Sequence, residues 1–252
     1  MDKERAAKKT MEQLWSPDTI RFLRDAAAVS GYYAEIARRA AAYFPPDAHV
    51  CDAGCGLGEL SLALLPYCRR VTAIDLCPAP IADLAGRLTP AQRARLEPVC
   101  GDILSGPPAE QYDAMVFCLF GTMEEILRAA ARCRGTVVAV KRDRAVHRFT
   151  AGGRDIAGYS GEAAEALLRR LGIPCRTERF TLELGQPLRS LEDAERFFRA
   201  YDSESAFSRE EILGKLEKGK SPEFPYYLPN QKHLRLLAFP AGSIPERREY
   251  RV

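Results

Sequence analysis

Short apolar segments that alternate with helical sequence constrain the fold of this chain most strongly. The apolar segments are residues 50–54, 71–75, 96–102, 112–120 and 136–141. Helical sequence lies between them, for example at 80–88 and 123–133. Parallel strands need helical crossovers of this kind, and strands covered on both faces read as nearly continuous apolar runs. The alternation therefore predicts a mostly parallel sheet with helices on both faces.

The two ends of the chain depart from this alternation. Residues 19–43 have apolar positions at helical spacing with a break at Ser30-Gly31, which predicts two helices. Residues 176–184 alternate polar with apolar side chains, as a strand near a sheet edge does, and 233–239 form a last strand. The mostly helical and polar segment 185–232 between these strands is expected to be a lid or a partner surface.

The length of 252 residues fits one large α/β domain with appendages. The expected organisation is a single structural domain in four parts. They are an N-terminal helical cap at 1–45, a cofactor-binding core at 46–184, the insertion at 185–232, and the last strand with a tail at 233–252.

Composition narrows the classes of partner. The chain has 37 Lys and Arg against 34 Asp and Glu, and a net charge of +3 gives no strong field for nucleic acid or an anionic membrane. The polar N-terminus has no apolar signal core, and no run approaches the roughly 18 apolar residues of a membrane span. Eight cysteines without CxxC spacing and three histidines predict neither disulfides nor a metal site. We expect a cytoplasmic protein, a monomer or homodimer.

A glycine-rich loop follows the first apolar segment, in the sequence VCDAGCGLGEL of residues 50–60. Glycines allow a sharp turn and a close approach of a ligand to the backbone. In a doubly wound sheet such a loop lies at the carboxyl ends of the strands, where ligands bind. Asp75 ends the next strand, where a carboxylate can accept the hydroxyl hydrogens of a ribose. The loop therefore predicts a nucleoside site.

The loop lacks the third glycine of the dinucleotide fingerprint, whose position falls on Glu59 or Ser61. Glu59 would put a negative charge at the helix N-terminus, where a pyrophosphate should rest. The loop thus favours a nucleoside without phosphates and with a cationic or zwitterionic tail. An NAD(P)-dependent oxidoreductase remains an alternative that this feature disfavours.

In these features the sequence resembles the class I S-adenosylmethionine-dependent methyltransferases, a seven-stranded Rossmann-like family. The resemblance covers the pattern of residues 46–141. It implies a three-layer α/β/α sandwich with a mostly parallel seven-stranded sheet and an antiparallel last strand. An N-terminal helical extension and a helical insertion between the last two strands complete the expected fold. The implied cofactor is S-adenosyl-L-methionine, with S-adenosyl-L-homocysteine as the product.

The resemblance also implies roles for individual residues. It places the methionine end of the cofactor on 52–58, the ribose on Asp75, adenine beside Asp102 and Ile103, and the methyl group beside Cys118. The full set of expected cofactor-binding residues is Asp52, Ala53, Gly54, Cys55, Gly56, Asp75, Leu76, Asp102, Ile103 and Cys118. Each has a structural alternative, such as a tight turn or a helix cap, but acidic residues after three successive strands favour a ligand site.

The segment after the fourth strand reads Phe117-Cys118-Leu119-Phe120-Gly121, without the Asn/Asp-Pro-Pro-Tyr/Phe pattern of enzymes that methylate planar amines. The sequence resembles instead the small-molecule methyltransferases, and the expected acceptor is an O, N or S atom of a small molecule. Aromatic side chains suit a sulfonium and a planar substrate. The expected substrate-pocket residues are Trp15, Tyr32, Phe120, Tyr159, Tyr226 and Tyr227. The same rings could instead pack the helices onto the sheet.

His147 is the candidate proton acceptor because it follows the fifth strand, whereas His49 and His233 begin strands and are expected to lie away from the site. Tyr33 is the second candidate catalytic residue, on a helix expected to pass over the cofactor. Basic residues near His147, among them Lys141, could recognise a substrate anion or form a solvated loop. A non-catalytic protein that binds S-adenosylmethionine is a further alternative.

Overall fold

The computed structural model describes residues 15–105, 111–143, 160–201 and 207–245. Contacts divide the chain into two compact units. We call the larger one the core unit; it consists of residues 33–145, 156–181 and 233–252. The smaller one, here the appended unit, consists of residues 1–32, 146–155 and 182–232. Each unit is described by itself.

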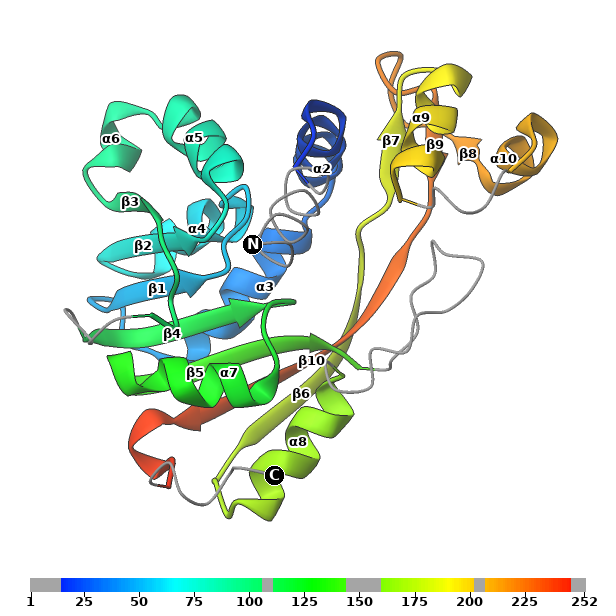
Figure 1. Cartoon of the computed structure of the whole chain (residues 1–252). Coiled ribbons are helices and arrows are strands. Elements are labelled where there is room, and N and C mark those ends of the chain that lie inside the picture. Colours follow the sequence, from blue (N-terminus) through cyan, green and yellow to red (C-terminus); the bar gives the residue numbers. More distant parts are fainter. Residues whose placement is uncertain (1–14, 106–110, 144–159, 202–206, 246–252) are drawn as a thin grey trace, which may run out of the picture. The chain divides into compact units, whose positions relative to one another are not determined.

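A seven-stranded sheet with the order β3-β2-β1-β4-β5-β10-β6 forms the middle of the core unit (Figure 1). Strands β1 to β5 pair in parallel, and β10 pairs antiparallel with β5. The strands are β1 (His49–Ala53), β2 (Arg70–Asp75), β3 (Leu96–Cys100), β4 (Tyr112–Cys118), β5 (Cys133–Arg142), β6 (Arg176–Glu183) and β10 (Gln231–Pro240). The predicted α/β class, strand count and antiparallel last strand are confirmed.

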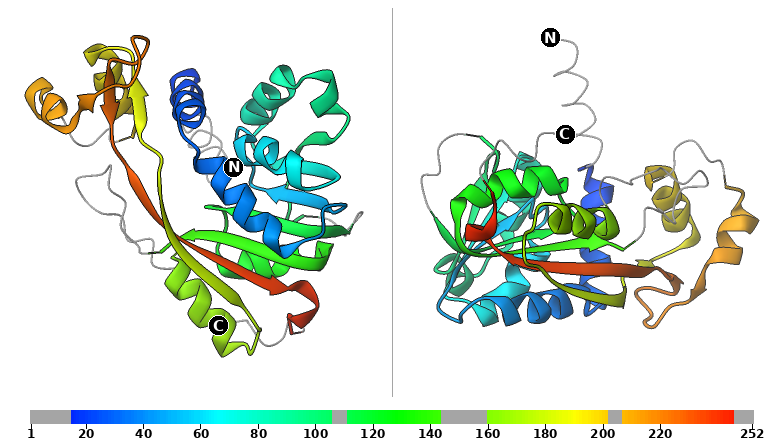
Figure 2. Two further views of the ribbon diagram at one scale, coloured as in Figure 1. Left: turned by 180° about the vertical axis from the view of Figure 1, so that it is seen from behind. Right: turned by 90° about the horizontal axis from the view of Figure 1, so that it is seen from below.

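Helices cover both faces of this sheet. They are α3 (Tyr32–Ala40), α4 (Glu59–Leu64), α5 (Pro78–Arg87), α6 (Pro90–Arg93), α7 (Met123–Ala129) and α8 (Gly161–Arg170). Figure 2 shows α7 and α8 on one side of the sheet and α3 on the other. Their starts are encoded locally: Thr122 Oγ1 accepts the amide of Glu125, and Ser160 Oγ accepts that of Ala163. The predicted break between the first two helices is likewise found, because one helix ends at Val29 and α3 begins at Tyr32.

One face of the sheet contributes a large apolar core under α7 and α8. Met115 and Phe117 of β4 and Val137 and Ala139 of β5 are fully buried there, with α7 and α8 above them. Residues two apart on a strand share a face, so these positions place the later Lys141 of β5 on the same face. Burial of such side chains stabilises the fold by about 1.5–3 kcal/mol for each large one.

The appended unit combines α2 (Pro17–Val29) with most of the insertion. Its insertion elements are β7 (Gln186–Leu188), α9 (Leu191–Tyr201), α10 (Arg209–Lys215), β8 (Glu217–Lys218) and β9 (Tyr226–Leu228). The strands form a small antiparallel sheet in the order β7-β9-β8. The prediction of a helical insertion is therefore incomplete, because the proline-rich segment supplies a strand. Short strands between prolines lack the length for a clear period-two pattern.

A shared core joins α2 to the insertion within the appended unit. The rings of Phe22 and Phe197 meet edge to face at 5.2 Å between centroids. Arg21 Nη2 lies 2.5 Å from the buried Asp193 Oδ1. Asp193 also pairs with Arg196, and Arg21 also pairs with Asp25, so this contact belongs to a small network of charges.

Candidate functional site

The glycine loop lies where β1 and β2 end, at the carboxyl edge of the sheet (Figure 1). Gly54, Gly56 and Gly58 have φ values of 71°, 53° and 71°, a region that side chains with a Cβ rarely adopt. The amides of Gly54 and Cys55 both donate to the Ile74 carbonyl, at 2.8 and 3.0 Å. The end of β2 therefore holds the loop after β1, and the glycines are required by its shape.

The Asp75 carboxylate connects the glycine loop to the loop after β2. Its Oδ2 accepts the Gly56 amide at 2.9 Å, and its Oδ1 accepts the Cys77 amide at 2.9 Å. A carboxylate has about four acceptor positions, so each oxygen can accept one more hydrogen. The half-buried Asp75 is thus a structural brace whose two oxygens can each accept a further hydrogen bond.

Asp52, at the end of β1, is 1% exposed and accepts the Ser61 hydroxyl at 2.5 Å. Burial raises the pKa of this carboxyl to about 7, partly offset by the Ser61 hydrogen bond. Asp52 therefore changes charge close to neutral pH. Sequence reasoning missed Ser61 as its partner, although it lies one helical turn into α4.

The segment after β3 carries the third predicted acidic residue. Asp102 is exposed; its Oδ1 accepts the Leu104 amide at 2.9 Å and its Oδ2 accepts the Ser105 hydroxyl at 2.6 Å. The Ser105 hydrogen bond lowers the pKa of Asp102. Ile103 is buried in the core, whereas Leu76 is 55% exposed. Leu76 is therefore the more available of the two apolar side chains for contact with a planar ring.

The loop after β4 brings an aromatic ring against the glycine loop. A Cβ placed on Gly54 would lie 2.1 Å from the Phe120 ring, so the ring rests directly on this glycine. Cys55 follows Gly54 in the sequence, and Cys118 lies two residues before Phe120. Burial raises the pKa of both thiols. They are neutral at physiological pH and do not act as thiolate nucleophiles.

In the structure, the Glu59 carboxylate disfavours a phosphate ligand less than the sequence indicated. Glu59 is the first residue of α4, as predicted, and its Oε1 lies 2.7 Å from Arg87 Nη2 of α5. Arg87 also donates to the Leu57 carbonyl. The guanidinium therefore compensates the carboxylate at the helix N-terminus.

The predicted substrate-pocket residues come from both units. Tyr32 begins α3, Trp15 precedes α2, and Tyr226 and Tyr227 lie in β9. The Tyr227 hydroxyl donates to Glu183 Oε1 at 2.9 Å, which gives this residue a structural role. The candidate Tyr33 is half-buried in α3. His147 and Tyr159 lie outside the described residues.

Two expectations about charged residues were wrong. His233 begins β10, but β10 runs antiparallel to β5, so His233 lies at the carboxyl edge of the sheet rather than away from it. The Asp143 amide donates to its carbonyl at 2.9 Å. Lys141, at the end of the predicted strand 136–141, was expected to face a substrate anion or solvent, yet it is 2% exposed. His49 does begin β1 at the opposite edge, where its ring bonds Thr72 at 2.8 Å.

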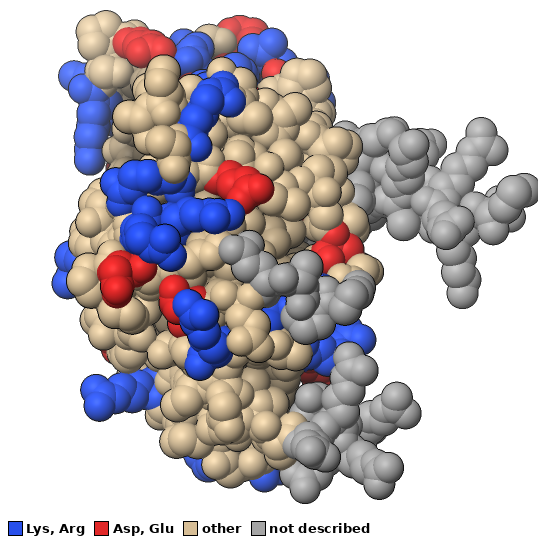
Figure 3. Space-filling view, turned by 90° about the vertical axis from the view of Figure 1, so that its left-hand side faces the viewer, with Lys and Arg blue, Asp and Glu red and all other residues tan. Residues whose placement is uncertain are grey.

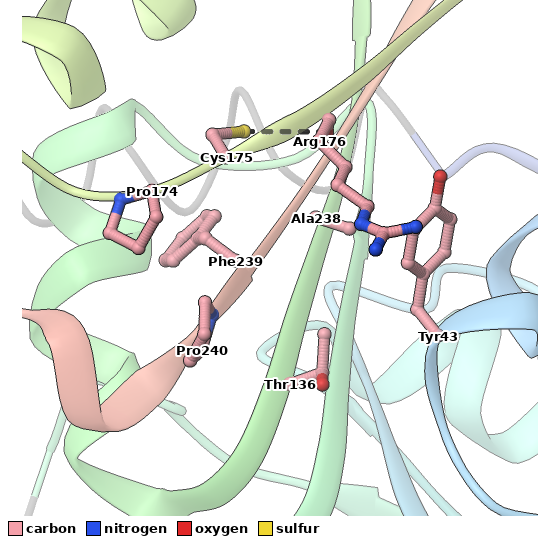
Figure 4. Close-up of a pocket in the computed structure, with 8 residues that line it drawn as sticks. All are labelled: Tyr43, Thr136, Pro174, Cys175, Arg176, Ala238, Phe239 and Pro240. Atoms are coloured by element: carbon pink, nitrogen blue, oxygen red, sulfur yellow. Dashed lines mark hydrogen bonds between the residues drawn. The ribbon is translucent and has the colours of Figure 1, made fainter.

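Two hollows lie at the amino edge of the parallel strands. One of about 320 Å³ is lined by residues of η1 (Ala41–Tyr43), β5, β6 and β10, and Figure 4 shows Tyr43 and Arg176 on one side of it. The Tyr43 hydroxyl donates to Glu178 at 2.7 Å, and burial raises its pKa to about 12. The lining residues Thr136 and Pro240 lie near the start of β5, so this hollow is away from the glycine loop.

The second hollow, of about 380 Å³, has arginines along it: Arg70, Arg93 and Arg95. Figure 3 shows Lys and Arg side chains gathered on this side of the molecule. Arg70 pairs with Glu97 at 2.6 Å, and Arg95 donates to the carbonyls of Leu65 and Cys68. We call these three arginines the basic groove.

Among the described residues, no group of three or more His, Cys, Asp or Glu side chains could hold a metal ion. No helix in the same part of the chain is long and apolar enough to cross a bilayer. All eight cysteines lie in the described ranges, and none of them forms a disulfide there.

Comparisons with known proteins agree with this geometry. A family model described as a methyltransferase domain matches residues 50–138. A 67-residue stretch is 43% identical to ribosomal RNA small subunit methyltransferase A of Thermobifida fusca (strain YX). That match covers 25% of this chain and 23% of the relative, so this chain spans only about a quarter of the relative's length.

Two solved structures share the fold. The provisionally assigned methyltransferase BH2331 of Bacillus halodurans C-125 is 12% identical, with a TM-score of 0.50 over 82% of this chain and 98% of that one. A protein of unknown function from Deinococcus radiodurans R1 is 13% identical, with a TM-score of 0.50 over 83% and 86%. At these identities the likeness concerns the fold.

Proposed function

We propose that this chain transfers a methyl group from S-adenosylmethionine to an O, N or S atom of a small molecule. Through residues 50–138 it belongs to the class I S-adenosylmethionine-dependent methyltransferases. The observation that carries this proposal is one constellation at the carboxyl edge of the sheet. There Asp75 accepts the Gly56 amide of the glycine loop, and the Phe120 ring lies against Gly54 of the same loop.

The residues present fit S-adenosylmethionine. Asp75 keeps two free acceptor positions for ribose hydroxyls, and exposed Leu76 offers an apolar surface to adenine. The exposed Asp102 follows β3, where its carboxylate can accept from an exocyclic amine. Asp52 lies beneath the glycine loop and would compensate the cofactor's ammonium group. Phe120 presents a ring that suits a sulfonium.

The bound cofactor supplies an electrophilic methyl group on a sulfonium. The protein then has to align an acceptor with that group and exclude water, which needs little covalent chemistry. The loop Cys118–Gly121 and the Phe120 ring form one wall for this purpose. Where the acceptor must lose a proton, His147 is the proposed base, with His233 as a second candidate at the same edge of the sheet.

The small-molecule acceptor is supported by the segment after β4, which lacks the pattern of planar-amine methyltransferases. Tyr32 was expected in the substrate pocket, but it is 1% exposed and therefore packs within the protein. The half-buried Trp15, Tyr226 and Tyr227 remain the proposed aromatic contacts of a planar substrate. The net charge of +3 gives little general attraction for a polyanion.

RNA is the second candidate acceptor, favoured by the basic groove and by the partial match to a ribosomal RNA methyltransferase. The groove lies at the amino edge of the strands, opposite the glycine loop, so an RNA would have to reach around the core unit. Binding that weakens steeply with salt, and that Arg93→Glu reduces, would support this candidate over a small molecule.

The test measures binding first and chemistry second. Titration calorimetry with S-adenosylhomocysteine should show one site, and NADH should give no binding. The protein is then incubated with methyl-labelled S-adenosylmethionine and a metabolite extract or total RNA. Label in a metabolite supports the proposal, and label in RNA alone supports the second candidate. Binding of the cofactor with no labelled acceptor in either supports a non-catalytic binding protein, and binding of NADH alone would refute the family role.

Asp52 predicts a pH dependence of cofactor binding. Its folded-state pKa is raised to about 7, so the carboxyl is protonated below that pH and charged above it. If the charged form holds the ammonium group, affinity for S-adenosylhomocysteine rises with pH and is about tenfold weaker at pH 6 than at pH 8. Calorimetry at both values measures this, and Asp52→Asn should bind weakly with no such dependence.

The same substitution makes an independent prediction for the ligand-free protein. A carboxyl with a raised folded-state pKa contributes stability below its unfolded value of 3.8, and this is lost as pH rises through about 7. Asp52→Asn should therefore be more stable than the wild-type protein at pH 8, by roughly 4 kcal/mol, because each pKa unit corresponds to about 1.4 kcal/mol. Equal unfolding midpoints in urea would contradict the buried charge.

A further inference from the structure

Lys141 lies at the end of β5 and is buried, with 2% of its side chain exposed. Its Nζ donates to the Phe120 carbonyl at 3.1 Å and also to the Gly121 carbonyl. Burial lowers the pKa of Lys141 to about 8, so the ammonium form still predominates at neutral pH. A buried ammonium is costly unless its hydrogen bonds are made, and here two of its donors serve the backbone of the loop after β4.

That loop has a strained and closely anchored backbone. Leu119 has a φ of 55°, which costs an L-residue about 1–2 kcal/mol. Its amide donates to the Val140 carbonyl at 2.8 Å. The residue after the two carbonyls that Lys141 contacts is Thr122, and its amide donates to Glu125 Oε2 at 2.6 Å. Each residue from 119 to 122 is thus tied to β5 or α7.

The anchored loop determines where the Phe120 ring lies. The ring rests on Gly54, at 2.1 Å from the position of an added Cβ, although 37% of the residue is exposed. A side chain with this much exposure has other rotamers available, so packing on one small glycine surface does not hold it alone. Its backbone carbonyl is held by Lys141. The contact between the β4 loop and the β1 loop therefore depends on a residue of β5.

We propose that Lys141 is a positioning residue that holds the loop 119–121 in its left-handed turn and thereby keeps the Phe120 ring over Gly54 as a wall of the cofactor site. The inference rests on the proposed function, since it assigns the wall to that site. Lys141 itself touches the loop and reaches a cofactor only through Phe120. A purely structural role would instead affect the stability of the whole core unit without a specific effect on binding.

The test is a double-mutant cycle with Lys141→Met and Phe120→Ala, read as the Kd for S-adenosylhomocysteine. Methionine keeps the length and the apolar stem but leaves the two carbonyls unsatisfied. Each single variant should weaken binding about tenfold, and the double variant should bind no more weakly than either, because both remove the same wall. Val137→Ala is the matched control: it creates a cavity on the same face of β5, lowers the unfolding temperature, and should leave Kd unchanged.

Amide hydrogen exchange supplies a local readout. In Lys141→Met the amides of 119–122 should exchange at least tenfold faster, with strand amides of β1 and β4 unchanged, whereas Val137→Ala should not show this pattern. If Lys141→Met does not fold, Lys141→Gln, which retains one donor group, replaces it. Unchanged Kd and exchange in a folded variant, or additive effects in the cycle, would overturn the inference. If the wild-type protein itself binds no S-adenosylhomocysteine, the proposed function fails first, and the assignment of the wall fails with it.

Discussion

Asp75→Ala is expected to weaken the binding of S-adenosylhomocysteine by about a hundredfold. Two ribose hydroxyls lose a charged acceptor, and hydrogen bonds to charged groups contribute about 1.5–3 kcal/mol each. The carboxylate also braces the site, because it accepts the amides of Gly56 and Cys77. The loss therefore combines direct contact with disorder of the glycine loop. Titration calorimetry measures the affinity.

The brace changes what to expect of the ligand-free protein. In Asp75→Ala two partly buried amides lose their acceptor, and we expect the free energy of unfolding to fall by about 1–3 kcal/mol. Asp75→Asn keeps one oxygen acceptor and should show smaller effects on both measurements. Asp83→Ala is the matched control, since it removes a carboxylate of neighbouring α5 whose Oδ2 lies 3.2 Å from Arg87 Nε. Wild-type affinity in Asp75→Ala would show that ribose binds elsewhere.

Gly54→Ala is expected to abolish measurable cofactor binding and to lower stability by several kcal/mol. The φ of 71° costs an alanine about 1–2 kcal/mol, and the added methyl would overlap the Phe120 ring at 2.1 Å. Either the ring or the loop has to move, and both form the proposed site. Urea unfolding and calorimetry measure the two effects.

Two further variants separate the causes of that loss. Gly86→Ala adds the same methyl group in α5, where nothing lies within 4 Å, and should be neutral or stabilising by up to about 1 kcal/mol. Gly54→Ala combined with Phe120→Ala removes the overlap but keeps the strained φ, so stability should return in part. Full stability in Gly54→Ala alone would mean that the ring does not rest on this glycine.

The sequence was a good guide wherever the relevant residues are neighbours in the chain. The strand at 50–54, the glycines after it and the acidic residue at 75 could all be assigned from the sequence, because strand period, turn chemistry and strand ends are local properties. The family match to residues 50–138 covers this same part of the chain.

Contacts between distant residues could not be predicted in the same way. Lys141 reads as the end of an apolar strand beside basic loop residues, and only the packing of β4, β5 and α7 buries it against the loop after β4. The position of His233 was not predicted, although an antiparallel last strand was expected. The first residue of an antiparallel strand lies at the carboxyl edge of the parallel strands, because the strand runs in the opposite direction.

The sequence by itself therefore determined the order of strands and helices, the conformation of the glycine loop and the acidic residues at the strand ends. Tertiary structure decided which of those groups are charged, anchored or in contact. It buried Asp52 against Ser61, placed Phe120 on Gly54, and joined α2 to the insertion through Phe22 and Phe197. The physical reason is that backbone conformation depends on adjacent residues, whereas desolvation and packing depend on groups that the chain brings together from far apart.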